Sequence, residues 1–173
     1  MNKVIIFEGP DKSGKTTIAK ELAKRYNISY FKNYSEQSNF VDKSFTQSAF
    51  IEANYLINIL NQVEIKNNTI ILDRHMPSEY AYSKTFGRKT NESLIWEYDE
   101  KFLKYSTVII YCYKNDYSEY TDEVVDMNQV NKLKKYYDEY LDKTKLKTLK
   151  LETSNEDLSS QINEIHKFIG WLK

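Results

Sequence analysis

The sequence predicts an α/β protein built as a three-layer sandwich, in which a five-stranded parallel sheet lies between helices on both faces. Short apolar segments alternate along the chain with longer segments whose apolar residues recur at helical spacing. The short segments also lack polar alternation, which is typical of strands covered on both faces. The resulting order, β-α-β-α-β-α-β-α-β-α, favours parallel strands joined by right-handed crossovers.

Composition and charge indicate one ordinary globular domain. The chain has 173 residues, of which 40% are hydrophobic and 29% charged, so we expect a single domain over residues 1–173. Its 25 basic and 25 acidic residues balance, which leaves no net charge to attract nucleic acid. No segment is apolar for long enough to form a signal peptide or a membrane span. We expect a cytoplasmic protein with neither nucleic acid nor membrane as partner.

The first half of the chain contains two predicted strands and two predicted helices. An apolar run at residues 4–7 predicts the first strand, and one-sided apolar spacing predicts a helix over 16–26. Residues 28–31 form the second expected strand. Helical spacing then resumes over residues 44–63, the longest predicted helix.

The second half continues the same alternation. Its apolar runs predict strands over residues 69–72, 107–113 and 149–151. Helical spacing predicts helices over residues 92–104, 130–141 and 156–172.

Residues 9–16 read Gly-Pro-Asp-Lys-Ser-Gly-Lys-Thr and match the pattern G-x-x-x-x-G-K-[ST] between a buried strand and a helix. This placement predicts a phosphate-binding loop, because backbone N–H groups and a helix N-terminus converge there. Lys15 is expected to bridge the outer phosphates of ATP, and the Thr16 hydroxyl to ligate Mg²⁺. The remaining expected nucleotide-binding residues of this segment are Gly9, Ser13, Gly14 and Thr17.

Asp73 and Arg74 directly follow the third predicted strand. In a parallel sheet the carboxyl ends of the strands form the ligand crevice, so both residues should lie beside the loop. A carboxylate there can orient Mg²⁺ through water, and Arg74 can neutralise charge on transferring phosphoryl oxygens. The sequence shows no structural partner for Arg74. We therefore expect Lys12, Lys15, Asp73 and Arg74 to carry catalysis.

These segments resemble the thymidylate kinase family, a branch of the nucleoside monophosphate kinases with the P-loop kinase fold. Residues 7–17, FEGPDKSGKTT, look like its motif F-E-G-x-D-x-x-G-K-T-T. Residues 73–82, DRHMPSEYAY, are similar to its motif D-R-[YH]-x-x-S-x-x-A-Y. Thr153 and Ser154 are a weaker echo and are expected to bind the nucleotide. The resemblance implies ATP and Mg²⁺ as cofactors, a short lid around residues 115–126 and a possible homodimer.

The resemblance also implies roles for individual residues. Asp11 and Tyr82 would face the sugar, Ser78 and Glu79 the base edge, and Arg74 the phosphates. Lys12 would be the cation of the phosphate loop, because residues 115–126 contain no arginine that could replace it.

One part of the family pattern is missing. The positions of its phosphate-binding arginine and base-stacking phenylalanine are held by Tyr55 and Ile51. We expect Phe50 to supply the stacking ring and Arg88 or Lys32 to meet the acceptor phosphate.

The leading interpretation is a kinase that transfers the γ-phosphoryl group of Mg-ATP to a deoxynucleoside monophosphate, with dTMP or a related pyrimidine nucleotide as acceptor. The alternative within enzymes is a kinase of deoxynucleosides, modified nucleotides or other small acceptors. The alternative outside enzymes is a non-catalytic nucleotide-binding switch. The complete loop beside Asp73 and Arg74, and the lack of a guanine-reading N-K-x-D segment, disfavour the switch.

Overall fold

The computed structural model describes residues 2–32, 44–62, 68–117, 126–170 and 172. Over these residues, five strands form one parallel sheet in the order β2-β3-β1-β4-β5. The strands are β1 (Lys3–Glu8), β2 (Ser29–Lys32), β3 (Thr69–Asp73), β4 (Ser106–Tyr113) and β5 (Lys147–Glu152). This architecture confirms the predicted fold class.

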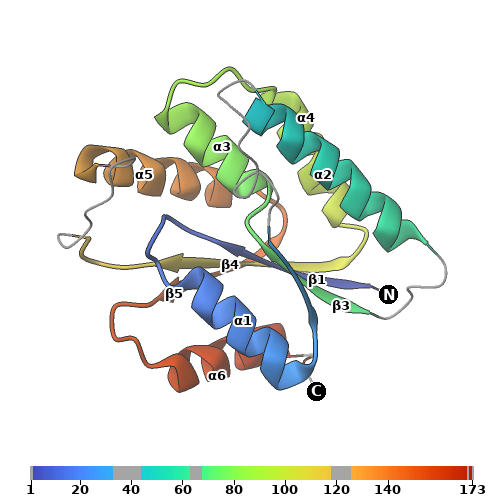
Figure 1. Ribbon diagram of the computed structural model, residues 1–173, viewed down its shortest axis with the longest axis vertical. Coiled ribbons are helices and arrows are strands. Elements are labelled where there is room, and N and C mark those ends of the chain that lie inside the picture. The colour runs from blue at the N-terminus through green and yellow to red at the C-terminus, as the bar shows by residue number, and fades with distance from the viewer. Residues whose placement is uncertain (1, 33–43, 63–67, 118–125, 171, 173) are drawn as a thin grey trace.

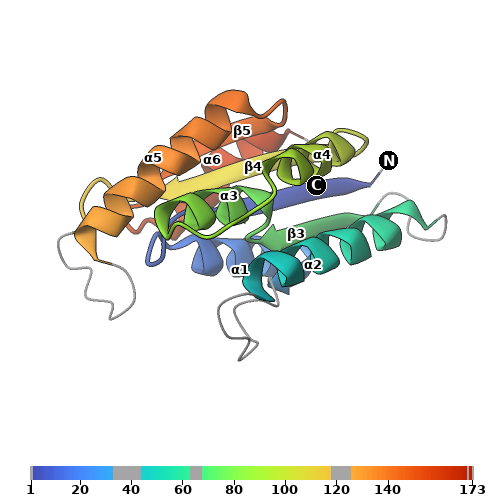
Figure 2. The ribbon, with the colours of Figure 1, turned by 90° about the horizontal axis from the view of Figure 1, so that it is seen from above.

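Helices cover both faces of the sheet (Figure 1). One face is covered by α1 (Lys15–Tyr26) and α6 (Leu158–Ile169). The other carries α2 (Ser44–Asn61), α3 (Met76–Thr85), α4 (Glu92–Phe102) and α5 (Met127–Lys143), onto which Figure 2 looks. None of the described helices combines the length and apolar character needed to cross a bilayer.

The central strand β1 explains why its apolar run is unbroken. Val4 and Ile6 enter the core beneath α2 to α5, whereas Ile5 and Phe7 enter the core beneath α1 and α6. All four side chains are at most 1% exposed. Successive strand residues point to opposite faces, so two covered faces require apolar residues at every position.

Helix α3 is the main difference from the sequence-based expectation, which had no helix between the strand at residues 69–72 and the helix at residues 92–104. It lies between α5 and α2 in its layer (Figure 2) and also contacts α4. Because neighbours surround it, even its polar residues Ser78, Glu79 and Ser83 are buried, and it has no one-sided apolar stripe. Pro77 and the acidic Glu79 in its first turn are helix-start signals in the sequence. The other elements lie within a few residues of their predicted bounds. Residues 118–125 of the expected lid lie outside the described residues.

Candidate active site

The phosphate-binding loop and the end of β3 lie side by side at the carboxyl edge of the sheet. β1 pairs with β3 on one side and β4 on the other, so the loop that follows it lies over the centre of the sheet. The backbone N–H of Arg74 donates to the carbonyl of Phe7 at 2.9 Å. The structure thus brings the two predicted segments together, at the edge where parallel α/β sheets bind ligands.

The loop holds its shape through close contacts with β4 and with the segment after β5. Gly9 has φ +142°, and a Cβ atom there would lie 2.1 Å from the carbonyl oxygen of Cys112. Thr153 Oγ1 donates to the carbonyl of Ser13 at 2.8 Å. Thr153 is 2% exposed, so it supports the loop from the interior of the protein. Gly14, with φ +77°, leads directly into α1.

Thr16 and Asp73, the two residues expected to serve a metal ion, contact each other directly. Thr16 Oγ1 donates to Asp73 Oδ2 at 2.6 Å, and the Tyr30 hydroxyl donates to the same oxygen at 2.7 Å. The other oxygen, Oδ1, is buried and has no hydrogen-bond partner among the described residues. A hydroxyl beside a carboxylate with an oxygen to spare fits Mg²⁺, which takes one or two protein oxygens and keeps water and phosphate as its other ligands.

The Asp11 carboxylate contacts two cationic side chains and one tyrosine hydroxyl. Its Oδ1 pairs with Arg74 Nη2 and lies 3.6 Å from Lys15 Nζ, and its Oδ2 accepts from the Tyr82 hydroxyl at 2.7 Å. Burial alone would raise the pKa of Asp11, but the charges of Arg74 and Lys15 and the Tyr82 hydrogen bond lower it below its ordinary value. Asp11 therefore stays ionised and holds both cations at the mouth of the loop.

Arg74 has structural partners that its sequence context did not reveal. Its Nη1 donates to the Gly9 carbonyl at 3.1 Å, to Ser78 Oγ at 3.1 Å and to the Tyr137 hydroxyl at 3.2 Å. The residue is 6% exposed and adopts φ +74°. The expectation of an unpartnered arginine was wrong, because Gly9 and Tyr137 lie 65 and 63 residues away in the sequence and Ser78 belongs to a helix that the sequence did not predict.

Glu8 is a buried carboxylate directly beneath this arginine. It accepts hydrogen bonds from the His75 backbone N–H at 2.6 Å, from Ser78 Oγ and from the Tyr137 hydroxyl at 3.3 Å. Burial raises the pKa of Glu8 to about 7, although the Ser78 hydrogen bond and the Arg74 charge act in the opposite direction. Sequence reasoning did not assign it a role. The available signals are its place as the Glu of the F-E-G motif and an acid that ends an apolar strand next to Gly9.

Comparison with known proteins identifies the chain's family. A family model described as an AAA domain matches residues 4–157. The chain belongs to this AAA domain family. No curated protein sequence matches it.

Solved structures share the fold of this AAA domain at low sequence identity. YorR from Bacillus subtilis, solved in complex with phosphorylated GDP, matches with a TM-score of 0.73 and 22% identity, over 96% of this chain and 95% of that chain. Deoxyadenosine kinase from M. mycoides matches with a TM-score of 0.63 and 17% identity, over 96% and 98%. Thymidylate kinase from Candida albicans matches with a TM-score of 0.63 and 17% identity, over 96% and 91%. The AAA domain therefore has the fold of the P-loop nucleotide kinases.

The remaining loop residues and Lys32 lie at the same edge of the sheet. Lys12 and Thr17 are exposed, and Lys12 has φ +60°. Lys32 ends β2 in register with Asp73, so it lies at the same edge of the sheet. Ser154 Oγ accepts from the backbone N–H of Asn115, where the predicted lid begins.

The structure does not bring every expected acceptor residue to the surface. Ser78 and Glu79 are buried, and Glu79 accepts hydrogen bonds from Ser83 and Thr90 at 2.7 and 3.0 Å. Phe50 is half-buried and its ring stacks on Tyr98 with centroids 5.8 Å apart. These three side chains take part in packing and internal hydrogen bonds.

A row of rings and guanidinium groups runs from the loop along α3. The Arg74 guanidinium lies 4.9 Å from the centroid of the Tyr82 ring, which stacks on Phe86 at 6.0 Å. The Arg88 guanidinium lies 6.0 Å from the Phe86 ring. Tyr82, Phe86 and Arg88 are half-buried. This row places Arg88 on the same side of the molecule as Arg74, two aromatic rings further along.

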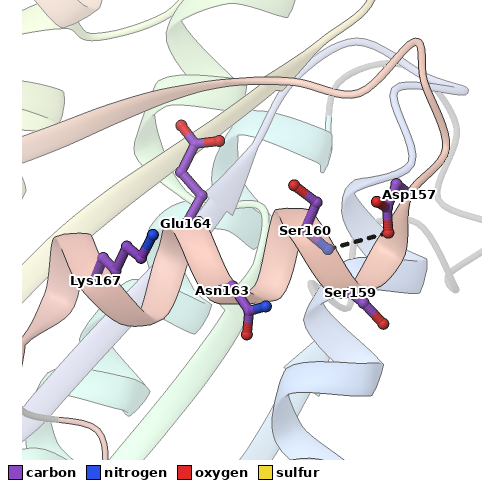
Figure 3. A pocket seen from close by; sticks show the side chains of 6 residues that line it. All are labelled: Asp157, Ser159, Ser160, Asn163, Glu164 and Lys167. Atoms are coloured by element: carbon purple, nitrogen blue, oxygen red, sulfur yellow. Dashed lines mark hydrogen bonds between the residues drawn. The ribbon is translucent and has the colours of Figure 1, made fainter.

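A shallow depression on α6 is not part of this site. Figure 3 shows its side chains diverging from α6 and from the N-cap residue of that helix. All six lining residues are exposed: Asp157, Ser159, Ser160, Asn163, Glu164 and Lys167. Asp157 already accepts the Ser160 backbone N–H as a helix cap at 3.1 Å. The depression lacks the buried, convergent polar groups that mark a ligand site.

Proposed function

We propose that this AAA domain is a small-molecule kinase that transfers the γ-phosphoryl group of Mg-ATP to a deoxynucleoside monophosphate, dTMP or a related pyrimidine nucleotide. The observation that carries the proposal is the convergence of Lys15, the Thr16 and Asp73 pair, and Arg74 at one edge of the sheet. Phosphoryl transfer depends mainly on positioning and on charge neutralisation, which are what these groups offer.

Each group has a distinct part in the proposed reaction. The loop N–H groups and the N-terminus of α1 would bind the triphosphate, with Lys15 at its outer phosphates. Thr16 and Asp73 would hold Mg²⁺, which when bound neutralises phosphate charge. Arg74 Nη2 reaches toward the mouth of the loop, where it pairs with Asp11. There it would stabilise the charge that spreads over the transferring oxygens.

For the acceptor, a deoxynucleoside is a specific alternative to a monophosphate. Ile51 and Tyr55 of α2 are 64% and 66% exposed, and neither side chain can offer an ion pair to a phosphate. A kinase of deoxynucleosides needs no such cation, so this observation favours it as the second candidate function. Asp11 and the Tyr82 hydroxyl form a polar pair at the loop mouth that suits a sugar hydroxyl in either case.

An acceptor panel tests the proposed function. The intact protein with ATP and Mg²⁺ would be offered dTMP, dUMP, dCMP, dGMP and dAMP, together with the five corresponding nucleosides. ADP release and the phosphorylated product would both be measured. We expect transfer to a pyrimidine monophosphate. Nucleotide binding without transfer to any small acceptor would leave the switch as the better interpretation.

Arg74→Lys is expected to lower the maximal rate by roughly 10²-fold or more, the scale of losing one transition-state donor. Lysine keeps the charge but loses the planar fork that serves several acceptors at once. Arginine and lysine both carry a Cβ, so the backbone at φ +74° is equally strained in the unaltered protein and in the variant. Steady-state kinetics would measure the effect, with Arg25→Lys on the exposed part of α1 as the control. A change confined to acceptor affinity would make Arg74 a binding residue.

Arg88→Ala is expected to raise the Michaelis constant for a monophosphate acceptor by about tenfold, the usual effect of losing one charged hydrogen bond. The constant for the matching nucleoside should change little, because the nucleoside has no phosphate. Lys89→Ala, on the exposed neighbour, is the control, and Lys32→Ala tests the second candidate cation. Nucleosides that outperform monophosphates, with a silent Arg88→Ala, would establish the nucleoside kinase instead.

A further inference from the structure

Three buried groups lie behind Arg74, on the side away from Asp11. They are Tyr137 of α5, Ser78 of α3 and Glu8 at the end of β1, and each is at most 7% exposed. We propose that Tyr137, with Ser78 and Glu8, forms a positioning group that fixes the direction in which the Arg74 guanidinium faces. The catalytic consequence rests on the proposed kinase function, whereas the positioning itself does not.

The contacts divide the guanidinium into two edges. Nη1 donates to Ser78 Oγ, to the Tyr137 hydroxyl and to the Gly9 carbonyl, at 3.1 to 3.2 Å. Nη2 faces Asp11. With Nη1 held inside the protein, the edge that carries Nη2 is the one directed at the loop mouth.

Glu8 orients the two hydroxyl groups. Ser78 Oγ donates to Glu8 Oε2, and the Tyr137 hydroxyl has Ser78 Oγ at 2.9 Å, Glu8 Oε2 at 3.3 Å and the Gly9 carbonyl at 3.4 Å within reach of its one proton. A hydroxyl that donates its one proton within this group keeps its lone pairs for other donors, and both oxygens accept from Arg74 Nη1. Glu8 therefore acts on the arginine through Ser78 and Tyr137.

Burial makes this arrangement effective. A hydrogen-bonded network in a low-dielectric interior is stronger than the same network in water. An unrestrained arginine would have to lose rotamer freedom during each reaction. Holding Nη1 in advance removes that cost from the transition state.

The first test reads the arginine directly and needs no turnover. The chain has only three arginines, Arg25, Arg74 and Arg88, so side-chain signals of protein labelled with ¹⁵N-arginine can be assigned with Arg74→Lys. We expect the Arg74 Nη protons to show restricted rotation and slow solvent exchange in the unaltered protein, and Tyr137→Phe to remove both properties.

Tyr140→Phe is the matched control. Tyr140 is also a fully buried tyrosine of α5, but its hydroxyl donates to Asp99 at 2.7 Å and not to the Arg74 network. This variant should leave the Arg74 signals unchanged. Thermal unfolding would show that both variants fold, and Ser78→Ala takes the place of Tyr137→Phe if that protein does not. Unchanged Arg74 signals in a folded Tyr137→Phe or Ser78→Ala protein would overturn the proposal.

The second test is a double-mutant cycle on phosphoryl transfer. Tyr137→Phe should lower kcat about 10- to 100-fold, with the Michaelis constant for ATP nearly unchanged. In the Arg74→Lys background the same change should have almost no further effect, because the group it positions is gone. Equal losses in both backgrounds would mean that Tyr137 acts through general stability. If the unaltered protein transfers no phosphoryl group, the proposed function fails, and the arginine signals still decide the positioning.

Discussion

Lys15→Ala is expected to abolish measurable phosphoryl transfer while the protein remains cooperatively folded. The Lys15 ammonium lies at the mouth of the loop, 3.6 Å from Asp11 Oδ1, and its side chain is 7% exposed. Without it, the outer phosphates lose their nearest fixed cation, for which we expect a rate loss of about 10²- to 10³-fold or more. The fold should survive, because Asp11 keeps its contacts with Arg74 and Tyr82.

The measurement is ADP release with the best acceptor from the panel, together with a thermal unfolding curve. Lys24→Ala is the control, because Lys24 lies on the same helix, carries the same charge and is exposed in its last turn. Activity of Lys15→Ala close to that of the control would remove the basis of the kinase proposal.

Gly9→Ala is expected to cause the largest loss of stability of any single methyl group added to the loop. The backbone conformation at φ +142° is open almost only to glycine. The new Cβ would lie 2.1 Å from the Cys112 carbonyl oxygen, which belongs to the backbone of β4 and cannot move aside. Strain and overpacking together should destabilise the protein by about 3 kcal/mol or more. Urea unfolding would measure the loss, and ATP binding should fall with it.

Gly87→Ala separates the two causes of that loss. Gly87 also has a positive φ, of +64°, but beyond its chain neighbours none of the described residues has an atom within 4 Å of the Cβ that alanine would add. Only the left-handed backbone is penalised there, by about 1–2 kcal/mol. A similar loss of stability in both variants would contradict the close approach of Gly9 to β4.

The fold and the phosphate loop could be predicted from local sequence. The run at Val4 to Phe7 is apolar at every position because both faces of β1 are covered. The loop needs glycine at two positive-φ positions, a lysine and a hydroxyl in a fixed order. Such signals are complete within a dozen residues, and Asp73 could be added because parallel strands end at one edge.

The partners of Arg74 and the identity of α3 as a helix could not be predicted in this way. Tyr137 occupies a position in the apolar stripe of α5, so its spacing indicates only that it is buried. Nothing local shows that its hydroxyl meets Glu8 and Arg74, which precede it by 129 and 63 residues. α3 lacks a stripe because it is surrounded, which becomes apparent only once α2, α4 and α5 are in place.

By itself, the sequence determined the parallel sheet, the loop from Gly9 to Thr16, and the meeting of that loop with Asp73, because these follow from periodicity and from short motifs. The tertiary structure alone decided which way Arg74 faces and which carboxylate lies behind it. It also decided that Ser78 supports the arginine and that Thr153 supports the loop. Periodicity reports whether a residue is buried, whereas the partner of a buried polar group depends on how separate elements pack against one another.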